Sequence, residues 1–482
     1  MTINNFENMN LSPEVLKALN NLGFLEPSEV QKEVIPEFLI GKDLVVKSQT
    51  GSGKTASFGI PLCELINTEE NKVKALVLVP TRELAIQVKE DISNIGRLKK
   101  VRCAAIFGKQ PFKEQERELK QRVHIVCGTP GRVIDHIERG NLDTSNIEFV
   151  VIDEGDKMLN MGFIDQISDI LKSLPKGKNT ALFSATVPEE IEHLYSNYMN
   201  SPTVLNVKSK VFNRDKISEK YLNVSREDKF KALLKLLYSF TDESSIIFCN
   251  TKDSVKNLSS LLKKEKISVK ELHGDMEQKE RLSTMESFKN REFKVLVATD
   301  VAARGIHISH ITNVFNYEIP MEKESYVHRI GRCGRGDKNG IAISLCSNGE
   351  IRFLNEIEEY IGYKINEVDF PSYEEVIEGR QTFFESQKNN YKKENKINKN
   401  IHNEVTRIHL SAGKKKKIRN VDILGALSNL EELSGEDIGI IDIQDGHSFA
   451  DILNNKGKLI LNKYKDIKLK GKIVKISRAK VI

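Results

Sequence analysis

Residues 48–55 (SQTGSGKT) place two glycines, a lysine and a threonine directly behind a short apolar run, residues 43–47. This pattern is typical of a phosphate-binding loop, although Ser48 stands where the general pattern has glycine. The backbone N–H groups can turn toward phosphate oxygens, the lysine can reach the terminal phosphates, and the threonine hydroxyl can hold Mg²⁺. A plain glycine turn is the alternative, but the position between a strand and a helix favours a nucleotide. The candidate nucleotide-binding residues are Thr50, Gly51, Ser52, Gly53, Lys54 and Thr55.

An acidic pair, Asp153 and Glu154, follows a second apolar run, residues 149–152. An aspartate at the end of a parallel strand faces the ligand crevice, so Asp153 is a second candidate for orienting Mg²⁺. Glu154 is the candidate for polarising an attacking water. An acidic surface cluster is the alternative, but the spacing of about 100 residues from the phosphate loop favours nucleotide hydrolysis.

Two hydroxyls, those of Ser184 and Thr186, follow the next apolar run. They can bond Asp156 and so couple the nucleotide site to the rest of a cleft. Capping of a helix that begins near residues 187–188 is an equally good interpretation of the local sequence.

Arg329, Arg332 and Arg335 recur every three residues, which predicts one helical face. An arginine supplied by a second body can stabilise charge on a transferring phosphoryl group, and Arg332 and Arg335 are the catalytic candidates for that role. A basic surface helix is the alternative. It is less favoured because each interleaved glycine costs roughly 0.5–1 kcal/mol inside a helix.

The elements that must position these residues predict an α/β protein. Short β-branched runs alternate with amphipathic stretches over residues 1–206 and again over residues 217–380, which predicts two parallel-sheet lobes. Only the first lobe has a phosphate loop, so a ligand shared across a cleft is expected. Residues 381–405 are Lys/Asn-rich and predict a flexible linker, and residues 406–482 suffice for a small α+β domain.

Composition narrows the class of protein. The 482 residues favour two or three domains, and no apolar run is long enough for a membrane span. Six scattered cysteines and the lack of a signal-peptide pattern predict a cytoplasmic protein with reduced thiols. Residues 406–482 hold 16 Lys/Arg against 9 Asp/Glu, whereas the whole chain has a net charge of +6. This basic end is expected of a nucleic-acid anchor, although a solvated lysine-rich surface explains the charge equally well.

The phosphate loop, the acidic pair, the two hydroxyls and the arginine run follow one another along the chain in this order. With this order of motifs, the sequence from Phe6 to about Gly362 resembles the DEAD-box family of RNA helicases. The resemblance implies two RecA-like lobes, ATP and Mg²⁺ as cofactors, and RNA as the partner. It also implies that Gln31 reads the adenine edge, with Phe24 in the same motif, and that His328 joins Asp156, Ser184 and Thr186 in coupling. The residues implied to grip the RNA backbone are Pro80, Thr81, Arg82, Thr129, Gly131, Arg132, Thr299 and Arg304.

Three stretches of the basic end, residues 413–427, 437–442 and 469–474, resemble the RNA-binding tail of the DbpA/YxiN group. The resemblance implies an RRM-like domain that recognises a hairpin of 23S ribosomal RNA. The aromatic stacking pair of ordinary RRM sheets is not found in the sequence. Binding is therefore expected to rest on Lys415, Lys417, Arg419, Lys470 and Lys472. The implied function is ATP-dependent local unwinding of RNA duplexes, by a monomer, during 50S subunit assembly.

Four positions depart from the family pattern: Gly155, where alanine is usual, His307, where aspartate contacts the ribose, a lone Gly108, and residues 336–337. A neutral imidazole at His307 can still hydrogen-bond a hydroxyl, but the affinity of the closed state for ATP becomes a question for experiment. Two other functions therefore stay open. One is an ATP-gated RNA clamp with weak hydrolysis, and the other is a DNA helicase of the same superfamily.

Overall fold

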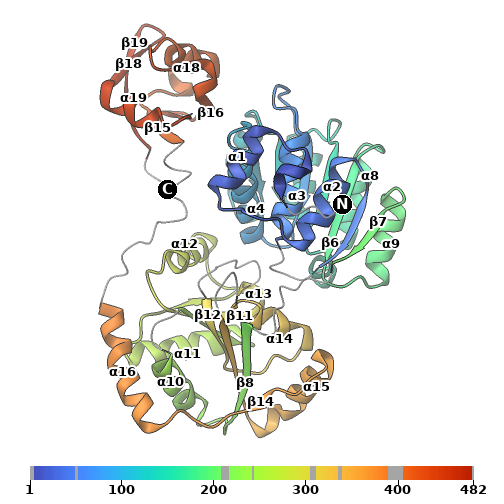
Figure 1. Cartoon of the computed structure of the whole chain (residues 1–482), viewed down its shortest axis with the longest axis vertical. Helices are drawn as coiled ribbons and strands as arrows, with labels where there is room; N and C mark the ends of the chain where they lie inside the picture. Colours follow the sequence, from blue (N-terminus) through green and yellow to red (C-terminus); the bar gives the residue numbers. More distant parts are fainter. Residues whose placement is uncertain are drawn as a thin grey trace. The chain divides into compact units, whose positions relative to one another are not determined.

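The computed structural model describes residues 5–48, 53–207, 216–240, 244–303, 311–334, 339–388 and 405–479. These residues form two parallel-sheet lobes and a C-terminal domain built on an antiparallel sheet, which confirms the predicted fold class (Figure 1). A helix capable of crossing a bilayer is not found in the described part of the chain. All six cysteines are buried and none forms a disulfide.

Lobe 1 holds a seven-stranded sheet in the order β3-β4-β2-β5-β6-β1-β7. Successive residues of one strand enter different cores: Leu44 and Val46 pack on one face and Val45 on the other. Both faces are therefore covered by helices, as the continuous apolar runs predicted. The strands are β1 (Leu44–Lys47), β2 (Ala75–Leu78), β3 (Cys103–Ile106), β4 (Ile125–Gly128), β5 (Phe149–Ile152), β6 (Asn179–Ser184) and β7 (Thr203–Asn206). The helices are α1 (Pro13–Asn21), α2 (Glu29–Leu39), α3 (Lys54–Leu65), α4 (Arg82–Ile95), α5 (Phe112–Leu119), α6 (Pro130–Glu138), α7 (Gly155–Asn160), α8 (Ile164–Ser173) and α9 (Glu189–Tyr198).

Lobe 2 repeats this architecture, with a second seven-stranded sheet in the order β10-β11-β9-β12-β13-β8-β14. The strands are β8 (Ile217–Asn223), β9 (Ser244–Cys249), β10 (Val269–Leu272), β11 (Val295–Thr299), β12 (Ile311–Asn316), β13 (Gly340–Cys346) and β14 (Asn366–Glu367). The helices are α10 (Lys229–Ser239), α11 (Lys252–Lys264), α12 (Gln278–Lys289), α13 (Asp300–Ala303), α14 (Lys323–Ile330), α15 (Ile351–Ile361) and α16 (Tyr373–Lys388).

Helix α16 changes one boundary expected from the sequence. The predicted linker begins at residue 381, yet α16 continues through Lys388. Phe383 is buried and its ring lies 5.7 Å from that of Tyr238 on α10, centroid to centroid. This packing holds the first residues of the expected linker against lobe 2, so they are part of its core.

The C-terminal domain has a five-stranded antiparallel sheet in the order β16-β17-β15-β19-β18. The strands are β15 (Thr406–Leu410), β16 (Ile438–Ile443), β17 (Ser448–Ile452), β18 (Asp466–Leu469) and β19 (Lys472–Arg478), and the helices are α18 (Asn420–Ser428) and α19 (Gly457–Lys463). One face of the sheet, with Ile408, Leu410 and Ala450, forms the domain's core together with residues of both helices. This order confirms the predicted small α+β domain.

Candidate nucleotide and RNA sites

The nucleotide motifs of lobe 1 meet at the carboxyl edge of its sheet. Strand β6 lies between β5 and β1, with Lys47 paired to Ser184 and Ile152 to Leu182. The loops that follow these three strands therefore open at the same edge. Gly53 caps α3 with φ of 91°, a left-handed conformation that favours glycine, and Lys54 is the first residue of that helix. Thr50, Gly51 and Ser52 lie outside the described residues.

Lys54 and Asp153 are both buried at this edge, 8% and 4% exposed. Burial raises the pKa of Asp153 to about 6, against the lowering effect of the Lys54 ammonium. Within the described residues, Asp153 Oδ1 has no hydrogen-bond partner. A buried carboxylate oxygen that lacks a donor fits a cation or its bound water, so Asp153 suits Mg²⁺. Thr55, the second residue of α3, can offer its hydroxyl to the same ion.

Glu154 carries a contact that the sequence analysis missed. It has φ of 56°, and its Oε1 accepts a hydrogen bond from Lys157 Nζ in a buried ion pair. The pair places a cation on the side chain expected to polarise water. The spacing of three residues at the start of α7 was the available signal, since such residues face each other on a helix.

Asp156, Ser184 and Thr186 form a hydrogen-bonded network. The Ser184 hydroxyl accepts from Asp156 N at 3.0 Å and donates to Thr186 O at 2.6 Å. Asp156 Oδ2 in turn accepts from Ala185 N and Thr186 N, both at 3.2 Å. The alternative of helix capping is wrong, because the N-cap of α9 is Pro188 and no side chain caps it. The network ties the end of β6 to the acidic motif.

Gln31 touches the end of the phosphate loop. It is 3% exposed, and its Nε2 donates to Gly53 O at 3.3 Å while its Oε1 accepts from Ser28 N at 2.9 Å. Phe24 is partly buried and packs edge-on against Phe6, with ring centroids 6.4 Å apart. The motif at the start of α2 therefore lies beside the nucleotide loop, although the rest of α2 and strand β1 separate the two in sequence.

The segments implied to grip RNA lie at the same carboxyl edge, after neighbouring strands β2 and β4. Pro80, Thr81 and Arg82 lead into α4, where Thr81 Oγ1 accepts from Leu84 N at 3.2 Å. Thr129 is the N-cap of α6, and Gly131 and Arg132 lie in its first turn. Because β2 and β4 are paired, two helix N-termini open side by side, an arrangement that attracts phosphate groups.

The guanidinium group of Arg132 is held by neighbouring residues, and that of Arg82 lies near Gly108. Arg132 Nη1 donates to Gln110 O at 3.2 Å and to Gln115 Oε1 at 3.1 Å. Arg82 lies against Gly108, where an added Cβ would be 3.4 Å from Arg82 Nη2. This is an ordinary contact with the end of a flexible side chain, so the space at residue 108 does not require glycine.

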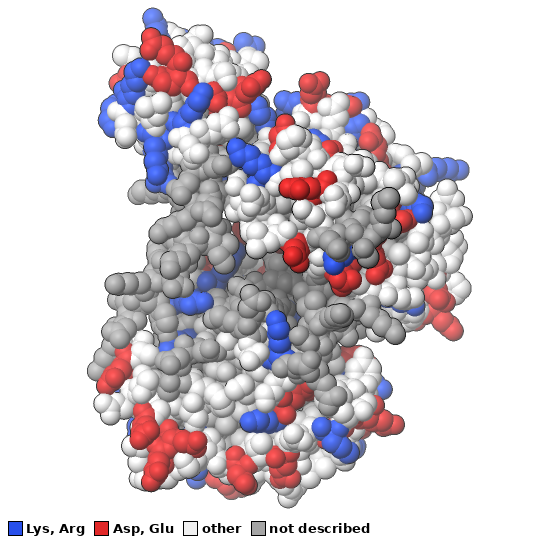
Figure 2. All heavy atoms as spheres, in the orientation of Figure 1, with Lys and Arg blue, Asp and Glu red and all other residues white. Residues whose placement is uncertain are grey.

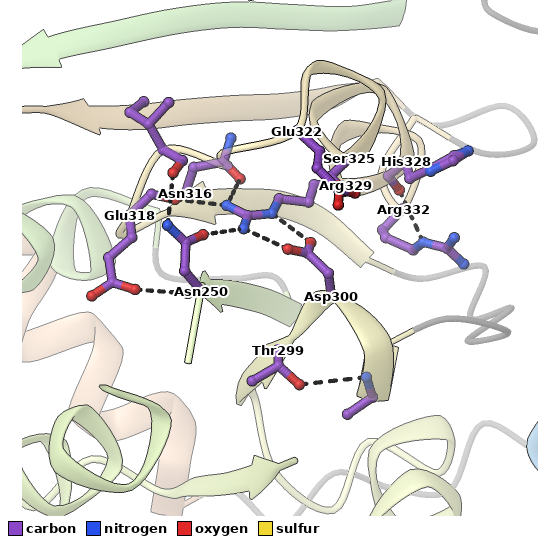
Figure 3. Close-up of polar contacts among 12 residues, drawn as sticks. Asn250, Thr299, Asp300, Asn316, Glu318, Glu322, Ser325, His328, Arg329 and Arg332 are labelled. Carbon is purple, nitrogen blue, oxygen red and sulfur yellow. Dashed lines mark hydrogen bonds and ion pairs between the residues drawn. The ribbon is translucent and has the colours of Figure 1, made fainter. Parts of the chain in front are cut away.

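In lobe 2 the two described arginines, Arg329 and Arg332, do not share a helical face, so the prediction is wrong for this pair. Helix α14 ends at Ile330, and Arg332 lies in the turn that follows, where its Nε donates to His328 O at 3.1 Å. Arg329 points the other way (Figure 3); its side chain is 1% exposed, and that of Arg332 is buried as well, at 3% exposed. Arg304, His307 and Arg335 lie outside the described residues.

Arg329 is the centre of a buried polar cluster that the sequence analysis did not foresee. Its Nε and Nη2 donate to Asp300 Oδ1 and Oδ2 at 2.6 and 2.7 Å, and Nη2 also donates to Asn250 Oδ1 at 2.7 Å. Its Nη1 donates to Glu318 O at 2.6 Å and Asn316 Oδ1 at 3.3 Å. These contacts join the ends of β9, β11 and β12 to α14. Thr299, the last residue of β11, accepts a hydrogen bond from Ala302 N at 3.4 Å.

In the C-terminal domain, Lys470 connects two of the segments that carry the candidate basic residues. Lys470 Nζ donates to Lys417 O at 2.7 Å and forms an ion pair with Asp422 Oδ2 at 2.9 Å. This lysine holds the loop that precedes α18 beside the turn between β18 and β19. Lys415, Lys417, Arg419, Lys470 and Lys472 are all exposed. Figure 2 shows that the visible face of the domain also carries acidic side chains.

Three family models match the chain. DEAD/DEAH box helicase matches residues 28–194, helicase conserved C-terminal domain matches residues 228–337, and DbpA RNA binding domain matches residues 407–478. The chain is 49% identical over 479 residues to the ATP-dependent RNA helicase DbpA of Bacillus subtilis (strain 168), covering 99% of this chain and 100% of that protein. It is 44% identical over 376 residues to the DEAD-box ATP-dependent RNA helicase CshA of Geobacillus kaustophilus (strain HTA426), covering 78% of this chain and 80% of that protein.

Among solved structures, the chain is similar to S. cerevisiae Dbp5 bound to RNA and ADP BeF3. The TM-score is 0.70 at 31% identity, with 79% of this chain and 100% of that chain covered.

Proposed function

The chain belongs to the DEAD-box family of ATP-dependent RNA helicases and is of the DbpA type, and on this premise we propose that it unwinds RNA duplexes locally while its C-terminal domain tethers it to a hairpin of 23S ribosomal RNA during 50S subunit assembly. The observation that carries this proposal is the shared carboxyl edge of lobe 1. Lys54, Asp153 and Glu154 lie at the edge where α4 and α6 present their N-termini.

At the nucleotide site, we assign phosphate binding to Lys54 and the backbone of residues 50–53, and adenine recognition to Gln31 with Phe24. Thr55 and Asp153 would hold Mg²⁺, and this ion would neutralise negative charge on the phosphates of ATP. Glu154 positions the attacking water and is held in place by Lys157. Arg332 and Arg335 stabilise the negative charge of the transferring phosphoryl group.

At the RNA site, the backbone contacts are assigned to residues 80–82, to residues 129–132, and to Thr299 and Arg304. ATP and RNA each favour the closed state of the helicase, so their binding is reciprocally coupled. The residues assigned to this coupling are Asp156, Ser184, Thr186 and His328. Local strand separation then follows from bending of one bound RNA strand.

The C-terminal domain raises the local concentration of duplex near its ribosomal RNA hairpin. We assign hairpin binding to Lys415, Lys417, Arg419, Lys470 and Lys472; the contact of Lys470 with Lys417 O supports the assignment for these two residues. We further propose that the protein acts as a monomer in the cytoplasm, where unpaired cysteines stay reduced.

The deciding experiment is phosphate release against a panel of ribosomal RNA fragments, with Lys54→Ala as the inactive control. We expect the 23S hairpin to stimulate hydrolysis and matched DNA to fail. An ATP-gated clamp, the alternative function, would bind ATP and RNA with the same fragments yet release little phosphate. RNA-stimulated release by Lys54→Ala would contradict the assignment of the nucleotide site.

A further inference from the structure

The sheet of the C-terminal domain has two unlike faces. Ile408, Leu410 and Ala450 belong to the core that α18 and α19 cover. Side chains alternate along a strand, so Arg407, His409 and Phe449 project from the opposite face. Of these, Arg407 is exposed, and the two rings are half-buried.

Three rings cluster on this second face. His409 of β15 and Phe449 of β17 are directly opposite each other in the antiparallel register, with centroids 5.5 Å apart. His447, which precedes β17, lies 5.2 Å from His409 and 5.1 Å from Phe449. The Arg407 guanidinium lies 5.0 Å from the centre of the Phe449 ring. The sequence analysis found no aromatic pair here, but the strand register brings a histidine and a phenylalanine together.

We propose that His409, His447 and Phe449 form a stacking platform for an unpaired base of RNA. Rings on the central strands of an RRM sheet stack two or three bases, and β15 and β17 are neighbouring inner strands of this sheet. Every base has a π-face, so such a platform binds unpaired RNA with little regard to sequence. The platform lies on the face of the sheet, whereas Lys415 and Lys417 lie in the loop before α18.

One arginine and two carboxylates border the rings, because Asp451 is opposite Arg407 and Asp442 is opposite Phe449 in the register. Arg407 Nη2 pairs with Asp442 Oδ2 at 3.4 Å, which holds the guanidinium beside Phe449. Ser477 Oγ lies 3.5 Å from His409 Nδ1. Burial and the neighbouring His447 lower the pKa of His409, which favours a neutral ring at pH 7. A neutral imidazole stacks on a base without the cost of desolvating a charge.

This inference rests on the proposed RNA binding by the C-terminal domain, and two RNA probes separate the two ideas. One is a short oligoadenylate that contains 2-aminopurine, and the other is the blunt 23S hairpin with no unpaired flank. Both are titrated against the full chain without ATP. We expect Phe449→Leu, which removes the ring but keeps an apolar side chain, to weaken oligoadenylate binding about ten-fold or more and to abolish 2-aminopurine quenching.

Two matched variants complete the design. Phe449→Tyr keeps a ring and should bind and quench like the wild type, while Lys415→Ala should weaken binding of the blunt hairpin and leave the quenching. If Phe449→Leu quenches and binds oligoadenylate as well as the wild type, the platform is refuted, whatever the hairpin does. If the blunt hairpin fails to bind but quenching depends on Phe449, the platform stands and the ribosomal tether fails.

Discussion

The guanidinium of Arg329 holds both carboxylate oxygens of Asp300, at 2.6 and 2.7 Å, inside lobe 2. This bidentate pair uses the planar fork of the arginine, which a lysine cannot reproduce. Arg329 therefore joins the ends of several strands and positions the turn that carries Arg332, and it is not free to contact a nucleotide. The arginine motif thus contains residues with two kinds of role.

We expect Arg329→Lys to destabilise the fold of lobe 2, by on the order of 1–3 kcal/mol, because one ammonium cannot replace the bidentate pair with Asp300 and also serve Asn250. Arg332→Ala should instead lower RNA-stimulated ATP hydrolysis strongly and lower the unfolding temperature less than Arg329→Lys, because its contact with His328 O lies within one turn and joins no strands. Thermal unfolding and phosphate release, measured on both variants of the full chain, test this division. Wild-type stability in Arg329→Lys would contradict it.

Gly155 is compatible with alanine. An added Cβ at Gly155, the first residue of α7, would meet Ile191 Cδ1 at 3.6 Å, an ordinary contact. We expect Gly155→Ala to stabilise the protein by about 0.5–1 kcal/mol and to keep RNA-stimulated hydrolysis at least as high. Gly53→Ala is the matched control, because its Cβ would approach Gln31 Nε2 to 2.7 Å at a positive φ. That variant should lose ATP binding, and a large drop in turnover for Gly155→Ala would refute the prediction.

Lys157 tests the role of the buried ion pair with Glu154. We expect Lys157→Met to lower kcat for ATP hydrolysis about ten-fold or more, because Glu154 loses the cation that orients it. The affinity for RNA should change little. Lys157→Arg should restore part of the rate, and steady-state phosphate release with both variants provides the measurement. Equal rates in Lys157→Met and the wild type would show that the pair only supports the fold.

Stability should fall between pH 6.5 and 4. Burial, with the charges of Arg122 and Arg102, lowers the pKa of His124 from 6.5 to about 4. The unfolded chain binds this proton first as pH falls, so the folded state loses free energy through that window. We expect His124→Gln to remove on the order of 1–3 kcal/mol of the loss. Part of the loss of stability should remain in this variant, because burial and the charge of Arg132 also lower the pKa of His136 to about 4.

Unfolding of the full chain, followed across this pH range, measures the effect. His124→Gln can keep an acceptor for Arg102 N, which bonds His124 Nδ1 at 3.0 Å. A pH dependence identical to that of the wild type would show that His124 is protonated equally in the folded and unfolded chain.

The nucleotide chemistry could be predicted from the sequence because each motif is contiguous. Lys54 follows its glycines directly, and Asp153 follows its strand directly. A parallel sheet with crossover helices then brings the carboxyl ends of its strands to one edge, whatever the rest of the fold does. Local spacing was therefore sufficient to name these candidates and the α/β class.

Residues that depend on long-range partners were decided only by the tertiary structure. Arg329 and Arg332 are three residues apart, a spacing that predicts one helical face, yet the helix ends between them. Arg329 then binds Asn250 and Asp300, which follow two other strands of the sheet. His409 and Phe449 stand far apart in sequence. The alternation of side chains along a strand predicts the face of the sheet on which each residue lies, but it does not predict which residue lies opposite on the next strand. Antiparallel register determines which side chains are opposite each other, and register is a property of the assembled sheet.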